Sequence, residues 1–67
     1  MPKNLEQLAA LISRRDGISL NEARDLIDET QEEINYVINN TLSYDEVVDI
    51  IASNLGLEPD YLDLFLF

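Results

Sequence analysis

The side chains that could do chemistry in this chain are carboxylates, with fourteen Asp and Glu among 67 residues. Paired carboxylates can act as general acid and base when one of them is desolvated and its pKa rises. Here every acidic residue falls on the polar face, the cap or the end of an expected helix. Histidine, cysteine and a glycine-rich phosphate loop are all absent. We therefore expect no enzyme activity, no catalytic residue and no cofactor.

A run of carboxylates could instead bind a cation. Ca²⁺ takes about six to eight oxygen ligands, which a calcium loop supplies from a turning backbone with a central glycine. Six of the fourteen acidic residues lie along one expected helix, at about residues 20–39, and an open helix face cannot surround a cation. We expect no metal site, for Mg²⁺ or for Ca²⁺.

The most distinctive carboxylates share one face of a helix expected at about residues 20–39, opposite its apolar face. These carboxylates belong to Glu22, Asp25, Glu29, Glu32 and Glu33, and Tyr36 lies on the same face. Only Arg24, on the flank, could offset their mutual repulsion locally. One interpretation is a surface that imitates phosphates and binds the basic groove of a nucleic-acid-processing protein. The alternative is a solvated face that keeps a small protein soluble.

The net charge of −10 disfavours direct contact with nucleic acid or with an anionic membrane surface. No run of eighteen apolar residues and no secretory signal is present. We expect a soluble protein of the cytoplasm, with a protein rather than nucleic acid or a membrane as its partner.

Polar residues with capping-box spacing mark where the helices should begin. The pairs are Asn4 with Gln7, Ser19 with Glu22, and Ser43 with Glu46. Gly17 and Gly56 are placed to end the first and third helices in the left-handed conformation. Pro59 suits the first turn of a fourth helix. The predicted helices span about 5–15, 20–39, 44–54 and 59–66.

Each of the first three predicted helices has an apolar face of helical period. In the second helix this face comprises Leu20, Ala23, Leu26, Ile27, Thr30, Ile34, Val37 and Ile38, and in the third Tyr44, Val47, Val48, Ile51 and Leu55. No segment has the alternation of a strand. We predict one all-α domain over residues 1–67, a compact three-helix bundle with a short fourth C-terminal helix.

The C-terminal segment is apolar almost all round, which is unusual for a surface helix. Its apolar residues are Leu57, Tyr61, Leu62, Leu64, Phe65, Leu66 and Phe67. It could fold back as a lid that completes the core of a small domain. It could also be an interface for self-association, with Tyr61, Leu62, Phe65 and Phe67 as the contacting residues. The two interpretations are compatible, and the second predicts a homodimer.

The stretch from Leu8 to Arg24, with its Gly17-Ile18-Ser19 turn and Glu22-Ala23 pair, resembles the two-helix part of ribbon-helix-helix repressors. That family reads DNA through a strand before its first helix. Only Met1-Pro2-Lys3-Asn4 stands in that place, so no DNA-contacting residue is carried over.

The whole chain, from Ile18-Ser19-Leu20-Asn21-Glu22-Ala23 to Gly56-Leu57-Glu58-Pro59-Asp60-Tyr61-Leu62, resembles small acidic helical proteins of bacteriophages and prophages of Gram-positive bacteria. The resemblance implies an accessory protein that acts on another protein in the cytoplasm of a bacterial host. Anti-CRISPR proteins are one class of such accessories. Our first hypothesis is an inhibitor that binds through the acidic face of the second helix, and the alternative is a homo-oligomeric structural or assembly module.

Overall fold

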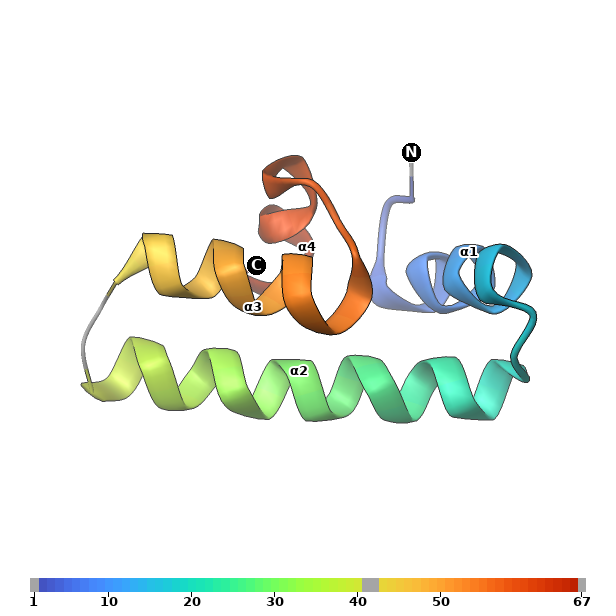
Figure 1. Cartoon of the computed structure of the whole chain (residues 1–67), viewed down its shortest axis with the longest axis horizontal. Helices are drawn as coiled ribbons and strands as arrows, with labels where there is room; N and C mark the ends of the chain where they lie inside the picture. The colour runs from blue at the N-terminus through green and yellow to red at the C-terminus, as the bar shows by residue number, and fades with distance from the viewer. Residues whose placement is uncertain (1, 41–42, 67) are drawn as a thin grey trace.

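The computed structural model describes residues 2–40 and 43–66, and these form helices and connecting turns without a strand (Figure 1). The helices are α1 (Leu5–Asp16), α2 (Leu20–Asn40), α3 (Tyr44–Leu55), the 3₁₀ turn η1 (Pro59–Leu62) and α4 (Asp63–Leu66). The all-α prediction is confirmed, and the first three helices lie within one residue of their predicted bounds.

The helix starts are made by the predicted capping residues. Backbone N–H groups three residues on donate to Asn4 Oδ1 at 2.9 Å, to Ser19 Oγ at 3.1 Å and to Ser43 Oγ at 3.4 Å. Each bond satisfies a donor that the first helical turn would otherwise leave free. The third capping box also predicts a hydrophobic staple between Leu42, which precedes Ser43, and Val47, and this contact lies outside the described residues.

Gly17 and Gly56 end α1 and α3 in the left-handed conformation, with φ of 69° and 64°. Their N–H groups return to carbonyls of the preceding helical turn, at Ser13 and Ala52. Any residue with a Cβ would be strained at these angles, so these two positions fix where the chain turns.

The long helix α2 is the common partner of α1 and α3. Both α1 and α3 pack against it, α3 beside its C-terminal half and α1 obliquely beside its N-terminal half (Figure 1). The Ser13 hydroxyl donates to the Ile18 carbonyl at 2.6 Å, which fixes the turn between α1 and α2. The result is a bundle-like helical globule.

The core lies between α2 and the helices packed on it. Its buried apolar residues are Leu8, Ala9, Ile12, Ala23, Ile27, Ile34, Val47, Ile51, Leu55, Leu57 and Phe65. Thr30 is also fully buried. Its hydroxyl donates to the Leu26 carbonyl at 2.7 Å and accepts from Asn54 Nδ2 at 3.4 Å, so its burial leaves no polar group without a partner.

Two residues that the apolar pattern assigned to the core are on the surface. Leu20 is 39% exposed and Tyr44 is 68% exposed. Each is the first residue of its helix, α2 and α3 respectively. Periodicity identifies the side of a helix that faces inward, but it does not show where the packing partner ends. These two core assignments are wrong.

The C-terminal segment differs in detail from the single helix predicted over 59–66. Its first turn, Pro59–Leu62, is 3₁₀ and only Asp63–Leu66 is α-helical. The segment packs against α3, and Leu57 and Phe65 are each only 6% exposed. Tyr61, Leu62, Leu64 and Leu66 are partly buried against the core. The segment therefore completes the core, as the lid interpretation expects.

One side chain joins the end of α1 to the end of α3. Arg15 Nη2 donates to the Leu55 carbonyl at 2.5 Å, and Nη1 donates to the Gly56 carbonyl at 3.4 Å. Its Nε also bonds Asp16 Oδ1 at 2.8 Å, and this hydrogen bond lowers the pKa of Asp16 and raises that of Arg15. Arg15 thus places a cation at the C-terminus of α3, where the helix dipole favours one.

Candidate protein-binding face

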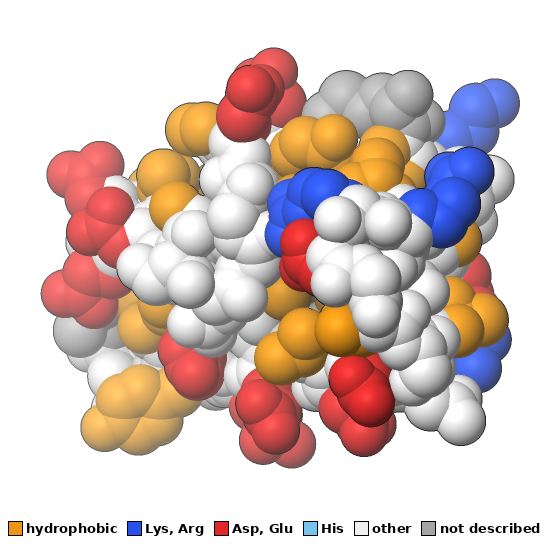
Figure 2. All heavy atoms as spheres, turned by 45° about the vertical axis from the view of Figure 1, so that its right-hand side comes forward, with side chains coloured by type: hydrophobic (Ala, Val, Ile, Leu, Met, Phe, Trp, Pro, Cys, Tyr) orange, Lys and Arg blue, Asp and Glu red, His pale blue; other side chains and the backbone are white. Residues whose placement is uncertain are grey.

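The side chains predicted to bind a partner are all exposed along α2. We call Glu22, Asp25, Glu29, Glu32, Glu33 and Tyr36 the α2 face. Figure 2 shows acidic side chains projecting from the lower side of the molecule, where α2 lies. The α2 helix is unbroken over 21 residues, which holds these side chains in one row.

The carboxylates of the α2 face have no basic partner within the described residues. The expected partner, Arg24, instead points across to α1, where its Nη2 bonds Glu6 Oε2 at 2.8 Å. The second ion pair of the described chain joins Arg15 to Asp16. No basic side chain of the described residues therefore offsets the repulsion along α2, and the face is available to an external cation.

Glu33 differs from its neighbours because it takes part in the packing of α2 against α3. Its Oε2 accepts a hydrogen bond from Asn54 Nδ2 at 3.2 Å, and the same nitrogen lies 3.4 Å from the buried Thr30 hydroxyl. Glu33 is thus the member of the α2 face with a structural role. Asp25, Glu29 and Glu32 have no such contact in the structure described, so they are the better residues for testing binding.

The charges are also segregated along the chain. All four basic residues precede position 25: Lys3, Arg14, Arg15 and Arg24. Residues 25–67 contain no Lys or Arg but hold eleven of the fourteen acidic residues. The other three acidic residues are Glu6, Asp16 and Glu22. In Figure 2, basic side chains appear near the centre and on the right, whereas acidic ones gather on the left, along the lower side and at the top. This segregation is visible in the sequence, although the residue patterns of single helices do not reveal it.

The charge density of the α2 face is close to that of nucleic acid. Glu22 and Glu33 are eleven residues apart, or roughly 16 Å along a helix axis. The five carboxylates on this length amount to about one charge per 4 Å, whereas one strand of duplex DNA carries about one charge per 3.4 Å. A groove lined by cations for a phosphate strand would therefore meet a similar line of charge.

Tyr44 is an exposed residue that the sequence interpretation missed. It begins α3, and its neighbours Asp45 and Glu46 are acidic residues of the first turn. Tyr36 is 70% exposed and lies four residues before the end of α2. Both tyrosines therefore belong to the end of the molecule where α2 leads into α3. The signal that could have placed Tyr44 outside is its position directly after the capping residue Ser43.

The C-terminal residues predicted for self-association have a different environment. Phe65 is buried in the core of the chain, and Tyr61 and Leu62 are partly buried. Phe67 lies outside the described residues. The homodimer stays a prediction, and within the described segment it would have to use the edges of side chains that already contact the core.

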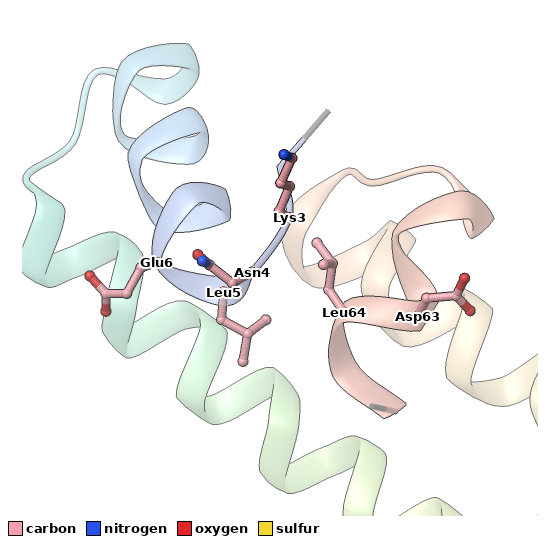
Figure 3. Close-up of a pocket in the computed structure, with 6 residues that line it drawn as sticks. All are labelled: Lys3, Asn4, Leu5, Glu6, Asp63 and Leu64. Atoms are coloured by element: carbon pink, nitrogen blue, oxygen red, sulfur yellow. The ribbon is translucent and has the colours of Figure 1, made fainter.

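A groove separates the start of α1 from α4 (Figure 3). It has a volume of about 530 Å³ and is lined by Lys3, Asn4, Leu5, Glu6, Asp63 and Leu64. Its charged residues have both signs, and none of the lining side chains is a thiol, hydroxyl or imidazole. Neither a charged ligand nor a reaction is favoured there. The α2 face is therefore the stronger candidate.

In residues 2–40 and 43–66, no cluster of three or more acidic side chains is arranged to hold a metal ion. No helix among the described residues is both long enough and apolar enough to cross a membrane. The chain matches no protein family, no curated protein and no solved structure. The resemblance to phage proteins therefore stays a prediction.

Proposed function

We propose that this chain, a small three-helix bundle closed by its C-terminal segment, is a non-enzymatic binding protein of phage type. It occupies a basic groove of a host nucleic-acid-processing protein in the bacterial cytoplasm and inhibits that protein, in the manner of an anti-CRISPR protein. The observation that carries the proposal is the row of exposed carboxylates on α2 without a basic partner in the described chain.

Apart from Glu33, which accepts a hydrogen bond from Asn54 of α3, the carboxylates of this row do not serve the packing of the fold. The core uses the opposite side of α2, through Ala23, Ile27 and Ile34. Like charges three or four residues apart on a helix destabilise it by about 0.2–0.5 kcal/mol per pair. A surface suited only to stability and solubility would mix acidic and basic residues. Binding to a basic groove would replace this repulsion with attraction, which gives the arrangement a use.

The attraction would come mainly from exposed charges, so it should be strongly screened by salt. The Debye length falls from about 30 Å at 0.01 M to about 3 Å at 1 M ionic strength. Because the groove would otherwise hold nucleic acid, the protein and duplex DNA should also exclude one another. Salt release alone is common to many acidic proteins, whereas competition by duplex DNA is specific to a phosphate mimic.

The test is capture of proteins from a Gram-positive bacterial lysate by the tagged chain, followed by mass spectrometry. Captured nucleic-acid-binding proteins should elute both in high salt and when duplex DNA is added. The test variant carries Asp25→Lys, Glu29→Lys and Glu32→Lys, which leave the capping residues and Glu33 intact. It should keep the helical circular dichroism of the wild type and capture none of these proteins.

A matched control carries the same change of net charge elsewhere, as Asp49→Lys, Glu58→Lys and Asp60→Lys. These three residues are exposed and lie outside α2. The control should still capture the partner. Equal capture by the α2 variant, or capture that duplex DNA does not reverse, would exclude phosphate mimicry by α2.

A further inference from the structure

The end of the molecule where α2 leads into α3 exposes two aromatic rings. Tyr36 is 70% exposed and Tyr44 is 68% exposed. The third tyrosine, Tyr61, is partly buried against the core. The only other large apolar residue that the described chain exposes strongly is Leu20, at the opposite end of α2.

Neither tyrosine belongs to the core or to the partly buried apolar residues packed against it. Exposed single apolar residues are common on proteins, but large aromatic side chains are enriched at binding interfaces, where Tyr and Trp often supply most of the binding energy. A tyrosine loses little conformational freedom on binding, because only two side-chain torsions have to be fixed. Two such rings at one end of a small protein are therefore suited to act as anchors.

The residues around the two rings indicate which charged group a partner would present to them. On the helix surface, Tyr36 neighbours Glu32 and Glu33, which are four and three residues before it. Tyr44 precedes Asp45 and Glu46 in the first turn of α3, and the last turn of α2 holds no basic residue. An aromatic face beside a carboxylate suits a guanidinium group, which stacks on the ring and bonds the carboxylate with two N–H groups. A lysine ammonium would gain the charge attraction but not the bidentate bond.

We propose that Tyr36 and Tyr44 anchor an arginine-bearing segment of the protein partner at this end of the molecule. The inference rests on the proposed function and extends it. The carboxylates of α2 supply attraction that does not depend on the kind of cation, and the two tyrosines make the surface prefer arginine to lysine. Contact then extends from the α2 face to the start of α3.

The test uses the full chain and two peptide probes, one of nine arginines and one of nine lysines. Titration calorimetry at low salt gives the affinity for each probe. The wild type should bind the arginine peptide more tightly. A variant with Tyr36→Ala and Tyr44→Ala should lose about fivefold to twentyfold in affinity for the arginine peptide and bind the lysine peptide as the wild type does.

Two further variants test whether the preference for arginine comes from the aromatic rings themselves. Tyr36→Phe with Tyr44→Phe keeps both rings and should keep the preference for arginine. Leu20→Ala removes an exposed apolar side chain at the other end of α2 and should leave both affinities unchanged. In NMR spectra, the arginine peptide should shift the ring resonances of Tyr36 and Tyr44 and leave those of Tyr61 in place.

Equal affinities for the two peptides in the wild type, or an unchanged preference in the double alanine variant, would overturn the anchor role. Either result leaves phosphate mimicry intact, because that proposal depends on charge alone. Conversely, if the preference for arginine persists after Asp25, Glu29 and Glu32 are changed to Lys while DNA-reversible capture also persists, the anchors stand and phosphate mimicry fails.

Discussion

The two ends of α2 differ in whether a charged side chain is paired with a neighbouring helix. Near its N-terminus, Arg24 reaches across to Glu6 of α1 at 2.8 Å, and Ser19 caps the helix. Near its C-terminus, the last turn holds no basic residue, and Tyr36 is 70% exposed. At the N-terminal end, the ion pair of Arg24 with Glu6 joins two helices. Toward the second end, Glu29 and Glu32 have no bonded partner within the described chain, which leaves them available to a binding partner.

The inner and outer sides of the C-terminal half of α2 also differ, in how far their side chains are buried. Ile34 is fully buried, although it lies between the exposed residues Glu33 and Asn35. The stability of the C-terminal half of α2 should therefore depend on its inner side. Changes on its outer side should alter binding with little effect on folding.

The largest predicted effect is on the inner side. Ile34→Ala should lower the free energy of unfolding by about 2–5 kcal/mol, because it leaves a cavity in the core. In a chain this small, much of the total stability would be lost. Leu20→Ala should change stability far less, since Leu20 is 39% exposed. Urea unfolding followed by circular dichroism measures both, and equal losses would contradict the assignment of the core.

The second effect concerns the link between α1 and α3. Arg15→Ala removes two hydrogen bonds to carbonyls at the end of α3 and should lower stability by about 1–2 kcal/mol, a value reduced for partial exposure of the side chain. Arg14→Ala is the matched control and should have an effect within about 0.5 kcal/mol. If the two variants have the same stability, Arg15 does not join the helices in solution.

A smaller effect should appear as a dependence on pH. The hydrogen bond from Arg15 lowers the pKa of Asp16 in the folded chain. Asp16 therefore contributes stability above its unfolded pKa of about 3.9, and this contribution is lost as the pH falls through the folded value. Asp16→Asn should be less stable than the wild type at pH 7, and the difference should shrink toward pH 2. A difference that stays constant with pH would exclude this linkage.

The smallest effect should be a gain in stability on the outer side. Glu29 has acidic neighbours four residues before it and three and four residues after it, namely Asp25, Glu32 and Glu33. Glu29→Gln should raise stability by a few tenths of a kcal/mol at low salt, and the gain should vanish at high salt. Glu6→Gln, which removes the partner of Arg24, should instead lower stability slightly. Thermal unfolding of the two variants at both salt concentrations should show opposite signs at low salt.

The local sequence predicts the bounds of the first three helices well, because each bound depends on a few neighbouring residues. Asn4, Ser19 and Ser43 each cap the helix that begins at the next residue, and Gly17 and Gly56 end a helix through their own backbone angles. The apolar period likewise assigns most of the core.

Contacts between distant segments could not be predicted in this way. The bond from Arg15 to Leu55 spans 40 residues, and the pair of Arg24 with Glu6 depends on how α1 crosses α2. The exposure of Leu20 and Tyr44 depends on where a neighbouring helix ends. The row of carboxylates on α2 was visible as a pattern, but the absence of a basic partner for it in the described chain required the fold.

The central claim is that the outer carboxylates of α2 serve binding and not folding. Its most direct test compares the wild type with the variant carrying Asp25→Lys, Glu29→Lys and Glu32→Lys, for unfolding in urea and for capture of lysate proteins that duplex DNA releases. We predict a variant that unfolds at the same or a higher urea concentration and captures none of those proteins. A variant that unfolds readily, or one that remains folded and still captures them, would contradict the claim.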